Sequence, residues 1–336
     1  MSSGGPPRRA AARAWCRVDL AGGTLDIWPL GLLHPGARTV NVAIDLPAGV
    51  TLTRRESGYS VRQGEIHLEA VDLAALAAEP EGVLAGTFLA ELDAPPVDVE
   101  LAAGSPRGGG LGGSSALGVA LIAAAEALAG REPSPPAARV ALARDLEARM
   151  MRLPTGVQDH WPALLGGVLE IGHGPGGTAV RRLAADLAAL GESLLVVYTG
   201  QSHFSAGANW RIVRRRLDGD PETARRFAGI AEAAAEAAAA LEAGDLPRLG
   251  AAVRREWEHR RELAPGISTP AIEAMLDAAA ALGAWGGKAC GAGGGGSIAL
   301  LCPSERRAAI AGRLAELGGT VLDVRPTAEP LAVDVG

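Results

Sequence analysis

Aromatic residues and lysine are scarce in this chain of 336 residues. Phenylalanine, tryptophan and tyrosine together make up only 3% of it, so stacked aromatic platforms for single-stranded nucleic acid are not expected. Lys288 is the only lysine among 32 basic residues, no long basic run occurs, and the formal net charge is −6. These features argue against a surface that follows a nucleic-acid backbone. We therefore expect no nucleic-acid partner.

Cysteine and long apolar runs are scarce as well. Cys16, Cys290 and Cys302 lie far apart and form no Cys-x-x-Cys metal or redox pair, which fits a reducing compartment. The most apolar stretch, Ala116–Ala129, is too short to cross a bilayer and contains Glu126. Arginines interrupt the N-terminal segment where an export signal needs an apolar run. We expect a cytoplasmic protein that does not associate with membranes.

Alanine, valine, leucine and glycine dominate what is present. Apolar residues make up 48% of the chain, so a core can form without disulfides, and the 46 glycines are available for tight backbone sites. The length predicts about two domains. We place a disordered leader at residues 1–12, an N-terminal domain at 13–178 and a C-terminal domain at 179–336. The boundary falls at the glycine-rich turn 174–177.

Apolar alternation predicts strands, and longer apolar or periodic segments predict helices. The expected strands are Ala14–Leu20, Thr39–Leu46, Val50–Val61, Glu65–Leu68, Val97–Leu101, Val168–Ile171, Leu194–Tyr198, Ser297–Leu301 and Thr320–Val324. The expected helices are Ala116–Leu128, Ala137–Met151, Ala206–Leu217, Pro221–Ala243, 246–260, 270–282 and Glu305–Leu317. Ser114 stands at the N-cap position of the first of these helices.

The glycine-rich loop 108–115 is the clearest binding signal. It precedes the helix Ala116–Leu128, so its amides and the helix N-terminus can converge on an anion. Its GxGxxG pattern is also found in dinucleotide-binding sites. Two observations argue against such a site here: the preceding strand carries Asp98 and Glu100, and no strand ending in an acid follows at the expected distance. The loop therefore predicts a phosphate cradle of another kind.

Two further glycine clusters flank this loop in the sequence. Gly291–Gly296 leads into the strand Ser297–Leu301 and can bring backbone close to a ligand. Lys288, beside it, is placed either to meet phosphate or to cap the preceding helix. The segment Arg17–Asp26 leaves a strand and presents Asp26 just past a turn. Taken alone, that segment reads as a hairpin turn.

Together, the order and spacing of the three clusters resemble the GHMP kinase superfamily, which includes galactokinase, homoserine kinase and mevalonate kinase. The resemblance runs from about Cys16 to Val324. It implies an α+β fold of two domains, the N-terminal one like domain 2 of ribosomal protein S5 and the C-terminal one a ferredoxin-like α/β sandwich. It also implies ATP and Mg²⁺, a small-molecule sugar or sugar-phosphate acceptor, and it allows a homodimer.

The resemblance also assigns the nucleotide loop. The residues that it implies for ATP binding are Pro106, Gly108, Gly109, Gly110, Leu111, Gly112, Gly113, Ser114 and Ser115. The hydroxyl of Ser115 corresponds to the family serine that joins the Mg²⁺ ligands, and its neighbour Ser114 could exchange roles with it. The alternative for either serine is simple capping of the helix.

Two acids separated by 12 positions, Glu147 and Asp159, resemble the catalytic pair of galactokinase-like and heptose-kinase-like members. By that resemblance Glu147 binds Mg²⁺, Asp159 is the base that activates the acceptor hydroxyl, and Arg17 lies near the base and the transferred phosphoryl group. Without the family pattern, Glu147 would be an exposed acid pairing with Arg144 or Arg149. Likewise, Asp159 would be a loop cap and Arg17 a surface residue at a strand end.

The acceptor site is assigned in the same way. The residues implied for it are Gly23, Thr24, Asp26, Gln158, Gly293 and Gly294. Asp26 is retained to accept a sugar hydroxyl, whereas the Glu and His with which galactokinases read galactose are replaced by Gly23 and Thr24. This disfavours galactose.

Other features resemble the branch of D-glycero-D-manno-heptose 7-phosphate kinase and fucokinase. They are the Gly-Gly start of the first cluster, Gln158 before Asp159, the pair Gly166 and Gly167, and the stretch from Thr199 to Ser205. His203 stands where that branch commonly has arginine, which weakens the expected grip on a phosphorylated acceptor. The alternatives are a mevalonate- or homoserine-type kinase, and a non-catalytic ligand sensor on the same fold.

Overall fold

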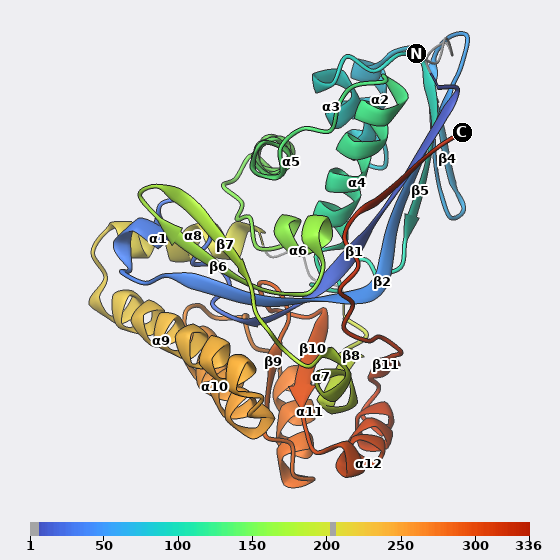
Figure 1. Ribbon diagram of the computed structural model, residues 1–336. Helices are drawn as coiled ribbons and strands as arrows, with labels where there is room; N and C mark the ends of the chain where they lie inside the picture. The colour runs from blue at the N-terminus through green and yellow to red at the C-terminus, as the bar shows by residue number, and fades with distance from the viewer. Residues whose placement is uncertain (1–6, 202–205) are drawn as a thin grey trace.

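The computed structural model describes residues 7–201 and 206–336, which form two β-sheets with helices packed on them (Figure 1). The strands are β1 (Arg9–Ala21), β2 (Arg38–Arg54), β3 (Tyr59–Gln63), β4 (Ile66–Ala70), β5 (Val97–Ala103), β6 (Val168–Gly174), β7 (Gly177–Arg182), β8 (Leu194–Tyr198), β9 (Gly286–Ala289), β10 (Ser297–Leu301), β11 (Thr320–Leu322) and β12 (Ala332–Val335). The helices are α1 (Leu30–Leu33), α2 (Leu73–Ala78), α3 (Val83–Glu91), α4 (Gly113–Leu128), α5 (Pro136–Met151), α6 (His160–Leu165), α7 (Leu187–Ser193), α8 (Ala206–Leu217), α9 (Pro221–Ala243), α10 (Leu246–Arg260), α11 (Pro270–Ala281) and α12 (Ser304–Glu316).

The larger sheet is organised around the long strand β2. Its order is β12-β1-β2-β5-β3-β4, and β6 and β7 extend from β2. Residues 38–42 of β2 pair with β6 and residues 48–54 pair with β5, so one strand belongs to two sheet regions. All pairs are antiparallel except β3 with β5. The register of β1 against β2 shifts between Trp15 and Arg17, an irregularity of the kind that re-aims side chains.

Helices α3 to α6 cover one face of this sheet. α4 is buried along nearly its whole length, as its apolar sequence predicted. It comes so close to α3 that a Cβ on Gly118 would lie 2.9 Å from the ring of Phe88. Its N-cap is Gly112, with φ of 73°, and not the predicted Ser114, because α4 begins at Gly113 and the serine lies inside its first turn.

The smaller sheet has the antiparallel order β11-β8-β10-β9, and its strands β8, β9 and β10 are buried on both faces. Leu194 and Val196 of β8 pack towards α9 and α10, in a core shared with β1 and β2. Leu195 and Val197 point the other way, towards α11 and α12. Helices on both faces explain why β8 is a continuous apolar run instead of an alternating one.

Three expectations about the chain's organisation differ from the structure. Residues 9–12 were expected in a disordered leader but belong to β1, because Ala10 pairs with both Leu52 and Val335. The hairpin partner β7 extends the larger sheet to Arg182, beyond the expected division at 178 and 179. The last strand, β12, returns to that sheet and pairs with residues 10–13 of β1 (Figure 1).

Several elements were not predicted as the structure has them. β2 runs unbroken to Arg54, whereas a new strand was expected from Val50. The short helices α1, α2, α3, α6 and α7 and the strands β7, β9 and β12 were not predicted. Asp72 was a usable signal for α2, because its side chain caps this helix by accepting from the amide of Ala75. No helix within residues 7–201 and 206–336 has the length and apolar character needed to cross a bilayer.

Candidate active site

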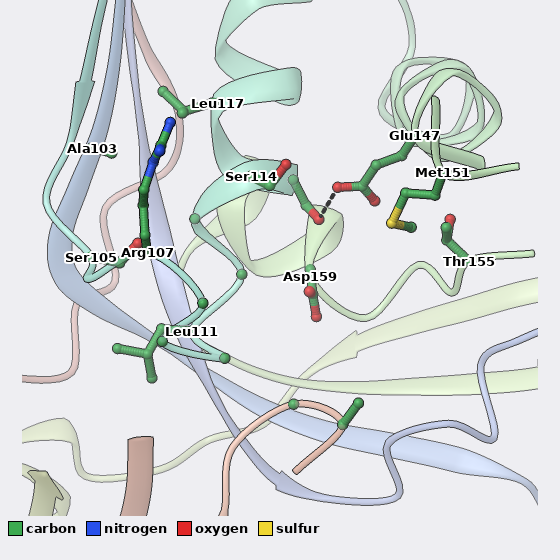
Figure 2. A pocket seen from close by; sticks show the side chains of 18 of the residues that line it. Ala103, Ser105, Arg107, Leu111, Ser114, Leu117, Glu147, Met151, Thr155 and Asp159 are labelled. Carbon is green, nitrogen blue, oxygen red and sulfur yellow. Dashed lines mark hydrogen bonds between the residues drawn. The ribbon is translucent and has the colours of Figure 1, made fainter. Parts of the chain in front are cut away.

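A cavity of about 640 Å³ lies where the loops after β1, β5 and β9 meet the end of α5 and the start of α6. Figure 2 shows Glu147, from α5, and Asp159, from the start of α6, close to the beginning of α4. The cavity lining combines three glycine-rich segments, the four carboxylates of Asp26, Glu81, Glu147 and Asp159, and an apolar part. The apolar part is formed by Val83, Leu84 and Met150, among others.

The loop between β5 and α4 forms one wall. Its lining residues are Ser105, Pro106, Arg107, Gly108, Gly109, Gly110, Leu111, Gly112, Gly113, Ser114 and Ser115, which include every residue predicted to bind the nucleotide. Gly108, Gly110 and Gly112 have φ of 65°, 73° and 73°, a region that side-chain-bearing residues rarely adopt. A Cβ on Gly113 would overlap the hydroxyl of Ser105. The bare backbone at the start of a 16-residue helix is suited to bind phosphate.

The loop before β10 packs directly against this wall. The amide of Ser297 donates to the carbonyl of Gly109 at 2.9 Å. A Cβ on Gly110 would lie 2.6 Å from the carbonyl of Cys290, and one on Gly296 would lie 2.9 Å from the carbonyl of Gly108. Glycine at both positions therefore allows two backbones to touch, which supports the phosphate loop from behind.

Arg17 and Asp159 form a pair at the floor of the cavity. Arg17 is 2% exposed and donates Nε and Nη2 to Asp159 Oδ1 at 2.8 and 2.5 Å. Its Nη1 donates to the carbonyl of Gly110 at 2.6 Å, and its amide donates to the carbonyl of Leu111. Burial opposes the charge of Arg17, but the carboxylates of Asp159 and Asp19 outweigh it and raise the pKa. Arg17 thus joins the carboxylate to the phosphate loop.

Ser115 and Glu147 meet beside this pair. Ser115 Oγ donates to Glu147 Oε1 at 2.8 Å, the hydrogen bond drawn as a dashed line to Glu147 in Figure 2. Glu147 Oε2 lies 3.3 Å from His160 Nε2. Burial acts to raise the pKa of Glu147, but His160, Ser115 and Arg17 outweigh burial and hold that pKa below its usual value. The structure therefore places the ionised carboxylate of Glu147 directly beside the hydroxyl of Ser115.

Asp26 lies on the loop that follows β1. Its Oδ2 accepts from the amide of Gln158 at 3.0 Å, and its Oδ1 is buried with no hydrogen-bond partner among the described residues. Burial raises the pKa of this carboxyl to about 6. Gly156 packs against it so closely that a Cβ there would overlap the carboxylate. Thr24, two residues earlier, has φ of 73°.

The structure brings most predicted acceptor residues to the cavity. Thr24, Asp26, Gln158 and Gly293 line it. The remaining two, Gly23 and Gly294, do not line it, because the carbonyl of Gly23 accepts from Arg260 and the amide of Gly294 donates to Ile267. His203 and Ser205 lie outside the described residues.

The alternatives that apply without the family pattern are wrong for Glu147, Asp159 and Arg17. Glu147 is buried and does not pair with Arg144 or Arg149, which instead pair with Asp145 and Glu91. Asp159 stands at the N-cap of α6 but makes no side-chain cap. Arg17 is buried and not at the surface.

Both expectations for Lys288 are wrong, and two further residues were missed. Lys288 lies in the interior, where it pairs with Asp19 and Glu256. His160 was missed as a partner of Glu147, although its position directly after Asp159 was a usable signal. Arg260, which contacts the loop after β1, had no sequence signal.

The residues present fit a nucleotide with Mg²⁺. The positive-φ glycines leave the phosphate loop without side chains over its amides, and Ser115 and Glu147 supply the oxygen ligands that Mg²⁺ prefers. Mg²⁺ in kinases is bound by one or two carboxylates together with substrate phosphates. Such a site does not require a cluster of three protein ligands, and no such cluster occurs in the described part of the chain.

Comparison with known proteins decides the family. Residues 77–167 match the GHMP kinases N terminal domain, and residues 237–319 match the GHMP kinases C terminal. The chain belongs to the GHMP kinases. It is 26% identical over 330 residues to a bifunctional fucokinase/GDP-fucose pyrophosphorylase of Arabidopsis thaliana, covering 90% of this chain and 30% of that protein. It is 30% identical over 223 residues to the mevalonate kinase of Methanothermobacter thermautotrophicus, covering 63% of this chain and 66% of that kinase.

Solved structures share the GHMP kinase fold over nearly the whole chain. A D-glycero-D-manno-heptose 1-phosphate kinase from Bacteriodes thetaiotaomicron has a TM-score of 0.77 at 19% identity, covering 97% of this chain and 98% of that one. The galactokinase of Lactococcus lactis in complex with galactose has a TM-score of 0.75 at 14% identity, covering 97% and 92%. The predicted α+β fold of two GHMP domains is confirmed.

Proposed function

We propose that this protein is an ATP- and Mg²⁺-dependent kinase that transfers the γ-phosphoryl group to a hydroxyl of a sugar or sugar phosphate. The observation that carries the proposal is the convergence of three features on one cavity. They are a side-chain-free loop at the start of α4, the oxygen pair of Ser115 and Glu147, and the carboxylate of Asp159. Phosphoryl transfer depends mainly on positioning and charge, which these features supply.

Each residue has a separate task. The amides at the start of α4 bind the phosphates, and Ser115 and Glu147 would hold Mg²⁺, which neutralises phosphate charge when bound. Asp159 orients the acceptor hydroxyl through Oδ2, the oxygen that Arg17 leaves free, and accepts its proton as phosphoryl transfer proceeds. Arg17 holds that carboxylate against the phosphate loop.

Two buried oxygen atoms, one on the loop after β1 and one just before α6, favour a phosphoryl acceptor that carries several hydroxyl groups. Asp26 Oδ1 and Gln158 Oε1 are buried and lack donors within the described residues, and both side chains line the cavity. Vicinal hydroxyls of a sugar can donate to both atoms. The fucokinase, heptose 1-phosphate kinase and galactokinase relatives are consistent with a sugar.

Mevalonate is the second candidate acceptor, on the observed 30% identity to an archaeal mevalonate kinase. A ligand sensor without activity is disfavoured, because a sensor has no need of a carboxylate held between the phosphate loop and the acceptor side. The carboxylate at Asp26 also favours a sugar over mevalonate, which offers fewer adjacent hydroxyls.

The test is ADP release coupled to a spectrophotometric assay, with free hexoses, fucose, heptose phosphates, mevalonate and homoserine as acceptors. We expect acceptor-dependent and Mg²⁺-dependent ADP release with a sugar or sugar phosphate, and its loss in Asp159→Asn. Release with mevalonate alone would select the second candidate. No acceptor-dependent release across the panel, or full release in the Asp159→Asn variant, would contradict the proposed mechanism.

A further inference from the structure

Four charged side chains form a closed set in the interior behind the loop after β1. Lys288 Nζ donates to Asp19 Oδ2 and to Glu256 Oε1, both at 3.0 Å. Arg260 donates Nε and Nη2 to the same Glu256 oxygen at 2.8 and 2.5 Å. Asp19, Glu256 and Lys288 have no exposed surface, and Arg260 is 2% exposed. Two acids and two bases balance, so burial leaves no net charge in this set.

The set joins distant parts of the chain. Asp19 lies in β1, Glu256 and Arg260 lie in α10, and Lys288 lies in β9. The lysine has a compact ammonium group that can contact two carboxylates at once from a short strand, whereas a guanidinium is larger and planar. This geometry explains why the only lysine of an arginine-rich chain stands at this position.

Arg260 also contacts the loop after β1. Its Nη2 donates to the carbonyl of Gly23 at 2.6 Å, and its Nη1 donates to Thr24 Oγ1 at 3.0 Å. A Cβ on Gly23 would lie 2.5 Å from Asp19 Oδ2 and 3.1 Å from Arg260 Nη2, so this glycine is needed for the approach. Thr24 has φ of 73°, a left-handed conformation that surrounding contacts must maintain in a β-branched residue.

We propose that Arg260 is a positioning residue for the acceptor, holding Thr24 in its left-handed conformation so that Asp26 faces the cavity. The proposal rests on the proposed function, in which Asp26 binds the acceptor. Arg260 itself does not line the cavity and does not touch the phosphate loop. Glu256, which Lys288 also contacts, keeps the guanidinium of Arg260 in place, so a helix of the C-terminal part sets the shape of a loop of the N-terminal part.

The test compares Arg260→Gln and Arg260→Lys with the matched control Arg261→Gln. Arg261 is the next residue, and its contacts are the ion pairs with Glu262 and Glu273 at the surface. We expect the acceptor KM of Arg260→Gln to rise by about 10-fold or more, since hydrogen bonds to a charged group are lost. The Kd for ATP should stay within about 2-fold of wild type, a split that general loss of structure does not produce. Arg260→Lys should recover part of the acceptor affinity.

A second arm needs no acceptor and no activity. Hydrogen exchange of the segment 20–28 should become faster in Arg260→Lys and in Thr24→Val, while the segment 108–116 exchanges as in wild type. Thr24→Val removes only the hydroxyl that Arg260 contacts, so it remains informative if Arg260→Gln does not fold. In the kinetic arm, Arg260→Lys combined with Thr24→Val should change the acceptor KM by less than the product of their separate effects.

The outcomes separate the two proposals. The positioning role is overturned if segment 20–28 exchanges in Arg260→Lys and Thr24→Val as it does in Arg261→Gln. It is also overturned if ATP affinity falls as much as acceptor affinity. If the wild-type protein phosphorylates no acceptor, the proposed function fails, and the exchange experiment still decides whether Arg260 holds the loop.

Discussion

Arg17 donates two hydrogen bonds, from Nε and from Nη2, to a single oxygen of Asp159, at 2.8 and 2.5 Å. This geometry uses Oδ1 and leaves Oδ2 without a hydrogen bond among the described residues. The Asp159 side chain remains 26% exposed, whereas that of Arg17 is 2% exposed. The arginine is therefore the buried anchor, and the free oxygen of the aspartate is the one that a bound acceptor can reach.

Replacing Asp159 by Asn should lower kcat by about 10²-fold or more, the usual contribution of a positioned proton acceptor. The Kd for ATP should change little, because the phosphate loop is a separate segment. Steady-state kinetics and calorimetry measure the two effects. Asp145→Asn, at an exposed acid of α5, is the control. A kcat near wild type in Asp159→Asn would remove this residue from the mechanism.

Ser115→Ala should raise the Mg²⁺ concentration needed for half-maximal activity by about 10-fold or more, because the variant lacks the proposed Mg²⁺ ligand and the hydrogen bond to Glu147. Ser114 is exposed and makes no hydrogen bond to Glu147, so Ser114→Ala should have a much smaller effect. Mg²⁺ titrations at saturating ATP distinguish them. A larger effect at Ser114 would reverse the assignment of the two serines.

Gly156→Ala should weaken acceptor binding by about 10-fold or more, because the new Cβ would overlap the Asp26 carboxylate and displace it. ATP affinity should be retained. Gly312→Ala is the matched control, since a Cβ there meets no atom within 4 Å and lies in α12. That variant should gain about 0.5–1 kcal/mol in the free energy of unfolding. Unchanged acceptor KM in Gly156→Ala would show that Asp26 does not bind the acceptor.

The acceptor KM should rise as the pH falls through about 6, where burial places the pKa of Asp26, because the protonated carboxyl is a weaker acceptor. The same shift acts on stability. A carboxyl with a raised pKa favours the folded state below its unfolded pKa, and this contribution is lost as the pH rises through the folded pKa.

Asp26→Asn should therefore gain about 1 kcal/mol of stability relative to wild type between pH 5 and pH 7, the part of a shift of roughly two pKa units that falls within this range. Urea unfolding at both pH values measures the difference, and the variant should also lose the pH dependence of KM near pH 6. A constant difference in stability across this range would contradict the raised pKa.

Much of the site was predictable because its signals are local. The glycine loop precedes an apolar helix in the sequence, and the interval between Glu147 and Asp159 matches a family pattern. Both carboxylates line the same cavity. The second half of β1 was also predicted, since apolar alternation is visible there. Its first five residues, 9–13, were missed, because they are held by pairing with distant segments, residues 49–53 of β2 and the last strand β12.

The sequence by itself determined where backbone must be free of side chains and which carboxylates stand beside it, since turns, helix starts and strand ends depend on neighbouring residues. Only the tertiary structure decided which charges are buried together. Lys288 meets Asp19 across 269 positions, and Arg260 meets Gly23 across 237. Nothing in the local sequence of either residue specifies such a partner, because a buried charge is stabilised by whatever the fold brings within hydrogen-bonding distance.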